Sequence, residues 1–158
     1  MVSEPTSDAV ADAFMARALG LAREALGDGD VPVGAVVVDA AGQIIGLGRN
    51  TRERDADPTG HAEIVALREA AAARGEWRLD DCTLYVTLEP CTMCAGAIVQ
   101  SRIARLVFGA WDEKAGAVGS LWDVVRDRRL NHRPEVTSGV RADESTDLLQ
   151  EFFREHRS

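Results

Sequence analysis

Two short motifs carry side chains that can bind a metal or move a proton. His61 and Glu63 are separated by one residue, and Cys91 and Cys94 follow some way along the chain with two residues between them. Pro90 fixes the backbone ahead of the cysteine pair, which is expected at a helix start, where free backbone N–H groups favour thiolates. Two thiolates at this spacing can bind one tetrahedral metal ion, and His61 is the obvious third ligand.

The predicted ligands His61, Cys91 and Cys94 leave one position of a tetrahedral ion unfilled. A structural zinc site would use four protein ligands, and a redox-active cysteine pair would need no histidine. An open position favours catalysis, since water can bind there and be activated. The spacing therefore favours a catalytic Zn²⁺, one per chain, over the redox and structural alternatives.

Glu63 raises a geometric question, because residues two apart in a helix interior point to opposite sides and cannot share a site. If His61 is at the very first helical position, its ring can turn toward the metal while Glu63 approaches from the side. An ion bound by two thiolates and one neutral imidazole is formally uncharged, so it acidifies water less than an all-histidine site. A general base is then needed, and Glu63 is predicted to supply it.

Strand and helix patterns alternate along the chain and position these motifs. Apolar spacing predicts a first helix over 7–26, a hairpin over 31–50, a long loop over 51–60 and a helix over 61–74. Further on, we expect a strand at 82–88, a helix at 91–101, a strand at 104–110, a short helical stretch near Trp122, a strand within 134–140 and a last helix at about 142–156.

The order strand, helix, strand from 82 to 110 implies a crossover and at least one parallel pairing. The predicted fold class is α/β, a three-layer α/β/α sandwich with helices on both faces of a mixed central sheet. With 158 residues and no internal repeat or linker, the chain is expected to form a single domain over 1–158 that includes the last helix.

Composition indicates an ordinary globular protein, with 46% apolar and 28% charged residues. The first residues lack the basic and apolar segments of a secretory signal, and the longest apolar run, 31–38, is too short to cross a bilayer. We therefore expect a cytoplasmic protein without a membrane partner. Three cysteines in a reducing compartment do not suggest a disulfide framework.

The net charge of −8 opposes general affinity for nucleic acid. The charge is uneven, however, since residues 1–101 hold 8 basic and 16 acidic side chains, whereas residues 102–158 hold 10 of each. Any phosphate-facing surface is expected in the second part, where 125–133 is richest in arginine. An exposed charged face with internal ion pairs is the alternative interpretation of that cluster.

The pairing of HAE at 61–63 with EPCTMC at 89–94 is the established signature of zinc deaminases. A much longer stretch, roughly residues 10 to 155, resembles the bacterial tRNA-specific adenosine deaminases. The segments that carry the resemblance are VPVGAVVV, DPTGHAEIVALR, LYVTLEPCTMCAGAI, SRIARLVFGAWDEKAGAVGS, NHR and FFR. The long match after Cys94 distinguishes this group from other cytidine deaminase-like families.

The resemblance implies a cytidine deaminase-like fold, usually a homodimer, that converts adenosine to inosine at the wobble position of a tRNA anticodon stem-loop. In that family's pattern, the zinc ligands match His61, Cys91 and Cys94, and the proton shuttle matches Glu63.

Four further residues are candidates only through the resemblance. Asn50 matches a residue that hydrogen-bonds the purine ring, and Asp112 matches an acidic residue that contacts the anticodon loop. Phe152 and Phe153 match a helix near the RNA surface, although buried packing explains these two rings equally well. Asn50 and Asp112 have ordinary alternatives too, because such residues commonly begin turns.

Two other functions are compatible with the motifs. A free nucleobase or nucleoside deaminase, of guanine or cytosine type, could use the same metal centre on a small molecule, and the acidic charge fits it better. A non-catalytic, zinc-stabilised binding module is the second, and it predicts a closed site with four protein ligands.

Overall fold

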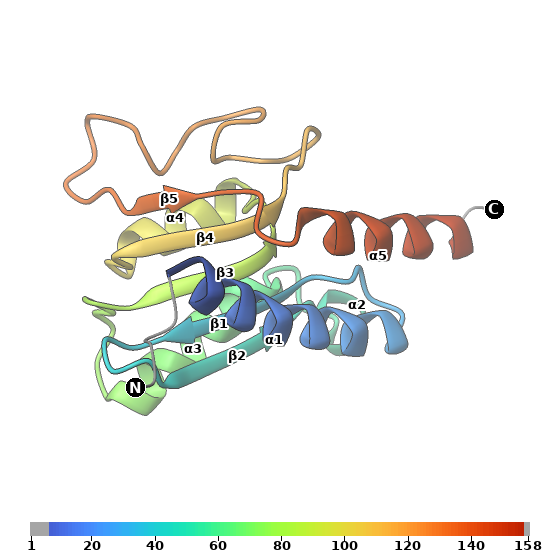
Figure 1. The fold of residues 1–158 in the computed structure, drawn as a ribbon, viewed down its shortest axis with the longest axis horizontal. Coiled ribbons are helices and arrows are strands. Elements are labelled where there is room, and N and C mark those ends of the chain that lie inside the picture. The colour runs from blue at the N-terminus through green and yellow to red at the C-terminus, as the bar shows by residue number, and fades with distance from the viewer. Residues whose placement is uncertain (1–6, 157–158) are drawn as a thin grey trace, which may run out of the picture.

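Five strands form one mixed sheet at the centre of the computed structural model, which describes residues 7–156 (Figure 1). The strands are β1 (Gly34–Val38), β2 (Ile44–Arg49), β3 (Thr83–Leu88), β4 (Arg105–Ala110) and β5 (Glu135–Thr137). Across the sheet they lie in the order β2-β1-β3-β4-β5. β1 pairs antiparallel with β2 and β3, whereas β3 with β4 and β4 with β5 are parallel. The hairpin and the parallel crossover predicted from the sequence are confirmed.

Helices cover both faces of this sheet, as the sequence predicts (Figure 1). They are α1 (Ser7–Gly27), α2 (Arg52–Asp55), α3 (Ala62–Arg74), α4 (Thr92–Gln100) and α5 (Ala142–Glu155). α1 and α5 contact each other on one face, and α3 and α4 contact each other on the opposite face. The architecture is therefore the predicted three-layer α/β/α sandwich.

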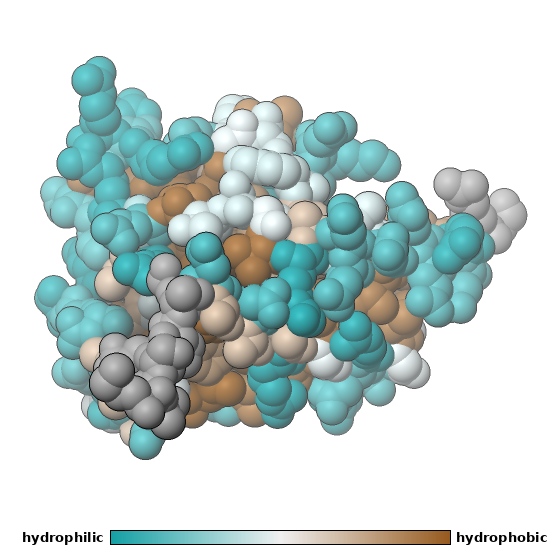
Figure 2. All heavy atoms as spheres, viewed as in Figure 1, coloured by the Kyte–Doolittle hydropathy of each residue, from teal (hydrophilic) through white to brown (hydrophobic). Residues whose placement is uncertain are grey.

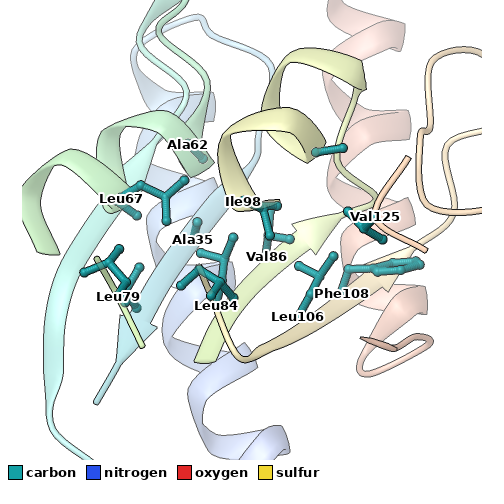
Figure 3. Packing of buried hydrophobic residues seen from close by; sticks show 14 of the residues in the cluster. Ala35, Ala62, Leu67, Leu79, Leu84, Val86, Ile98, Leu106, Phe108 and Val125 are labelled. Carbon is teal, nitrogen blue, oxygen red and sulfur yellow. The ribbon is translucent and has the colours of Figure 1, made fainter. Parts of the chain in front are cut away.

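The strands contribute side chains to two apolar layers, one on each side of the sheet, because successive side chains of a strand point to opposite faces. In β1, Ala35 and Val37 join the layer under α3 and α4, whereas Val36 and Val38 join the layer under α1. Figure 3 shows the first of these layers, in which residues from β1, β3 and β4 meet residues from α3 and α4. These α3 and α4 contacts matter for function, since both helices begin at predicted metal ligands.

Two glycines on β2 allow α3 to lie unusually close to the sheet. A Cβ atom added at Gly48 would stand 2.1 Å from the Ala62 carbonyl oxygen, and one added at Gly46 would stand 2.3 Å from that of Ala66. Such distances are below any van der Waals contact, so neither position accommodates a side chain without displacing the helix backbone. The depth of the first turn of α3, which carries Glu63, is thus fixed by the edge strand.

Two local predictions are wrong. The helical stretch expected near Trp122 is a series of turns, with an isolated bridge between Val118 and Asp123. Farther along this segment, the Asp127 carboxylate accepts the backbone N–H of Arg129 at 2.9 Å, and local bonds of this kind compete with a helix. The single-turn helix α2, in contrast, lies inside the segment expected to be a loop.

Hydrophilic side chains cover much of the face that carries α1 and α5, and apolar side chains are exposed between them in small groups (Figure 2). Within the described residues, every helix is too short or too polar to span a bilayer.

Candidate active site

His61 and Cys91 occupy equivalent positions at the starts of α3 and α4. Each is the residue before the first helical residue, with extended backbone angles of φ −76°, ψ 151° for His61 and φ −77°, ψ 179° for Cys91. Their carbonyls accept the first helical hydrogen bonds, from Val65 and Ala95. The spacing of His61 and Glu63 is explained by this geometry, because His61 lies just outside the helix and its ring is free of helical constraint.

The three predicted ligands converge. Nδ1 of His61 lies 3.5 Å from Sγ of Cys91 and 3.4 Å from Sγ of Cys94, and the three donor atoms all lie within 4.8 Å of one another. A tetrahedral ion with typical bonds of about 2.3 Å to sulfur and about 2.0 Å to nitrogen would separate these atoms by about 3.5 Å. The donor set therefore fits a metal ion, and within residues 7–156 no other such cluster of histidine, cysteine and acidic side chains occurs.

The cysteine pair is polarised. Hydrogen bonding from the Cys94 thiol, with a further contribution from the His61 ring, lowers the pKa of the Cys91 thiol to about 3. The same contact raises the pKa of Cys94, since its proton is shared with the neighbouring thiolate. The bond to Cys91 likewise raises the pKa of His61. A bound cation would remove this competition and allow both sulfurs to act as thiolates.

Glu63 lies in the first turn of α3 with only 4% of its surface exposed. Burial raises the pKa of its carboxyl to about 7. A buried carboxyl of this kind has the chemistry of a general acid–base group that works at neutral pH.

A cavity of about 160 Å³ opens beside this group. Glu63, His61 and Cys91 line it, while Cys94 is fully buried behind them. Asn50, a candidate for substrate binding through the resemblance, also lines it.

The Asn50 side chain has a defined orientation. Its Oδ1 accepts the backbone N–H of Arg52 at 3.1 Å, and the residue is 7% exposed. Its two amide N–H donors are thus the groups that can serve a ligand. The Thr51 N–H donates to the carbonyl of Gly60 at 2.8 Å and so closes the loop after Asn50. Asn50 and His61, the residues next to this pair, are thereby held near each other.

Comparison with known proteins agrees with this geometry. The MafB19-like deaminase family model matches residues 10–157. A tRNA-specific adenosine deaminase from Haemophilus influenzae is 55% identical over 144 residues, which cover 91% of this chain and 83% of that protein. The chain belongs to the tRNA-specific adenosine deaminases.

Solved structures extend the comparison. One, from a study of A-to-I editing by tRNA:A34 deaminases at the wobble position of transfer RNA, has a TM-score of 0.83 and 45% identity, and covers 87% of this chain and 99% of that chain. A guanine deaminase from Nitrosomonas europaea has a TM-score of 0.76 and 27% identity, over 96% of this chain and 86% of that one. The deaminase fold predicted from the sequence is confirmed.

Asp112 of this deaminase borders two cavities. Its Oδ1 accepts the backbone N–H groups of Lys114 and Ala115, at 3.1 and 3.2 Å. Asp112 and Ala115 also line a second cavity of about 630 Å³ that extends to Trp111 and to Phe153 of α5. A ligand larger than one base could therefore continue from the first cavity into the second.

The two adjacent phenylalanines of α5 have different surroundings. Phe152 is 8% exposed and stacks on the His156 ring, with 4.0 Å between centroids, whereas Phe153 is 53% exposed and lines the second cavity. Of the two predicted candidates for RNA contact, only Phe153 has a surface that a ligand could reach.

Sequence reasoning missed other residues of the cavity. Arg52 and the apolar pair Val31 and Val33 line it. Arg52 follows Asn50 by two residues, and a charged residue so near a predicted substrate contact was a usable signal. The valines gave none, since apolar residues ahead of a strand are expected in any core.

Two arginines of the segment 125–133 form ion pairs with acidic side chains close in sequence. Arg126 pairs with Asp123 at 3.1 Å and Arg129 pairs with Asp127 at 2.6 Å. Only the Arg129–Asp127 pair lies within the segment, as the interpretation of a charged face with internal pairs expects.

Proposed function

We propose that this chain hydrolyses adenosine to inosine at the wobble position of a tRNA anticodon, using one zinc ion per chain. The observation that carries the proposal is the gathering of buried Glu63, the three-donor group and the Asn50 amide around one cavity. Membership in the tRNA-specific adenosine deaminases supports the choice of substrate.

Nδ1 of His61 and the sulfurs of Cys91 and Cys94 would hold the zinc. Two thiolates and an imidazole suit zinc better than magnesium or calcium, which prefer oxygen ligands. When bound, zinc supplies Lewis-acid activation of a water molecule.

Glu63 moves the protons of the reaction. Its carboxylate takes a proton from the attacking water and delivers it to ring N1, which makes C6 electrophilic. The water oxygen bonds to C6, and the same carboxyl passes the second proton to the amino group. The C6–N6 bond then breaks and ammonia leaves, so the overall change is one water consumed and one ammonia released without oxidation or reduction.

The other residues bind and orient the substrate. The target adenosine must leave the loop stack, at a cost that is reduced because anticodon bases are unpaired. The Asn50 amide would donate to the purine ring, and Asp112 and Phe153 would contact the neighbouring nucleotides along the second cavity. We also propose a cytoplasmic homodimer, the usual form in the family that the sequence resembles.

A second candidate is deamination of free nucleobases. The net charge of −8 and the likeness to a guanine deaminase favour it. The acidic charge would not oppose the approach of a small neutral base as it opposes that of RNA.

One experiment separates the two. Purified protein is incubated with an anticodon stem-loop that has adenosine at the wobble position, with the same stem-loop carrying guanosine there, and with free adenosine, guanine and cytosine. Inosine in the first RNA, measured by mass analysis, with no turnover of the free compounds is the expected result. Turnover of a free base without inosine formation in the RNA would reject the proposal.

A further inference from the structure

The carboxylate of Glu89 is enclosed by the loop that follows β4. Glu89 comes directly after β3, is 2% exposed, and accepts four hydrogen bonds from that loop. Oε1 accepts the backbone N–H of Asp112 at 2.9 Å and the hydroxyl of Ser120. Oε2 accepts the backbone N–H groups of Val118 at 2.9 Å and Ser120 at 3.1 Å.

Within residues 7–156, this arrangement contains no ion pair. Among the described residues, none of the recorded ion pairs involves Glu89, so loop dipoles alone satisfy the charge. The loop approaches so closely that a Cβ added at Gly116 would stand 2.2 Å from Oε1. A further hydrogen bond, from the Ala117 N–H to the Pro90 carbonyl at 2.8 Å, joins the same two segments. The loop 112–120 is thereby fastened beside Cys91.

The fastened loop forms a wall of the cavity. Asp112 and Ala115 line it, and the Asp112 carboxylate binds the Ala115 N–H in turn. A continuous series of contacts therefore runs from the Glu89 carboxylate through the Asp112 backbone to the surface that faces a substrate.

We propose that Glu89 is the positioning residue of this wall: its buried carboxylate sets where Asp112 and Ala115 stand, and so governs how tightly the RNA substrate is held. The inference rests on the proposed function for the identity of the substrate. Both oxygens of Glu89 are occupied by loop donors, so its role differs from proton transfer by Glu63.

Glu89→Gln tests the idea with minimal change of shape. The amide nitrogen would face N–H donors of the loop, so at least one donor loses its acceptor. We expect amide hydrogen exchange at Asp112, Val118 and Ser120 to accelerate by about tenfold or more. KM for the stem-loop should rise by about tenfold, while kcat changes by less than about threefold, as for an interaction made equally in the ground and transition states. Metal content should remain one ion per chain.

Three further comparisons control for misfolding and indirect effects. Gly116→Ala pushes on the same carboxylate from the loop side and should reproduce the KM increase. Gly20→Ala on α1, where a Cβ meets nothing within 4 Å, is the matched control and should leave KM unchanged. In an Asp112→Asn background, the effect of Glu89→Gln on KM should shrink, because both changes act on one wall.

Three results would overturn the proposal: unchanged exchange of the loop amides in Glu89→Gln, an unchanged KM despite faster exchange, or a fall in kcat with loss of metal. Wild-type protein that leaves the stem-loop unaltered would refute the proposed function instead, and the exchange data would still decide whether Glu89 holds the loop.

Discussion

The helix-start side of the cavity and its loop side are held in place by different forces. On the first side, His61 and Cys91 precede helices whose apolar faces pack on the sheet. On the second, Asn50 and Asp112 lie in loops that are fixed by hydrogen bonds. Packing restrains many atoms at once, whereas each hydrogen bond restrains one backbone group, so the two sides should respond differently to substitution.

The loop side has two anchors of the same kind. Glu89 holds the loop that begins at Asp112, and Asp30, which is 1% exposed, accepts the N–H groups of Glu53 and Arg54 at 2.7 and 3.2 Å. The side chain of Thr51, the residue before α2, makes no capping hydrogen bond. The Asp30 carboxylate, which is distant in sequence, accepts the free N–H groups of that helix instead. In the proposed function, the metal donors and Glu63 thus lie at packed helix starts, and the substrate-binding residues lie on loops anchored by buried acids.

The largest effect is expected from a metal ligand. Cys94→Ala removes a fully buried donor, and we expect loss of bound metal and of all measurable deamination. Metal content by atomic absorption and inosine formation measure the two losses. Cys82→Ala is the matched control, because Cys82 is also fully buried but lies outside the donor group. Retention of one metal ion per chain in Cys94→Ala would contradict the assignment.

Glu63→Ala should give the next largest effect. Removing a general acid–base group typically lowers the rate by about 10²–10⁴-fold, and the three metal donors are untouched. We expect stoichiometric metal with inosine formation reduced by that factor in single-turnover assays. Activity near that of the wild type would exclude Glu63 as the proton carrier.

Asn50→Asp sharpens the comparison on the loop side. Aspartate keeps the oxygen that accepts the Arg52 N–H but removes both amide donors. We expect kcat/KM for the stem-loop to fall by about 10–100-fold, the loss of one or two hydrogen bonds in a buried site, with an unchanged melting temperature. Asn50→Ala should lower both kcat/KM and the melting temperature, because it also removes the acceptor of the Arg52 N–H. Equal melting temperatures for the two variants would mean that the bond to Arg52 does not hold the loop.

Asp30→Asn should have the smallest effect. The amide keeps one acceptor for α2 but places a donor against the other N–H, which we expect to cost about 1–2 kcal/mol of unfolding free energy and to lower kcat/KM only a fewfold. Denaturant titration measures the first and steady-state kinetics the second. Asp55→Asn, at an exposed residue of the same helix, is the control and should change stability by less than about 1 kcal/mol. A larger loss of activity in Asp30→Asn than in Asn50→Asp would reverse the ranking.

The helix-start side could be predicted from the sequence because its determinants are local. Pro90 and the spacing of the cysteines indicate the start of α4, and the two-residue separation of His61 and Glu63 predicts His61 at the first position of α3, one residue from its observed place just before the helix. The layers of the sandwich can be predicted because the apolar runs of β1, β3 and β4, which are buried along nearly their whole length, alternate with segments that have helical spacing.

The loop side could not be predicted in the same way, because its determinants are distant in sequence. The partners of Glu89 lie 23 to 31 positions away, and Asp30 binds backbone groups 23 and 24 positions away. Backbone N–H groups have no sequence signature, so neither anchor could be matched to its loop. The helix expected near Trp122 is wrong because side chains of this segment, such as the Asp127 carboxylate, hydrogen-bond nearby backbone N–H groups instead.

The bare backbone of β2 at Gly46 and Gly48 has a consequence for how the enzyme could be tuned. Because glycine has no side chain, the backbone of this edge strand packs directly against the start of α3, which carries Glu63. A side chain larger than glycine at Gly46 or Gly48 would push α3, and with it Glu63, away from the sheet. We therefore expect turnover in this deaminase to be adjustable from the rim of the sheet, at two positions that lie outside the lining of the cavity.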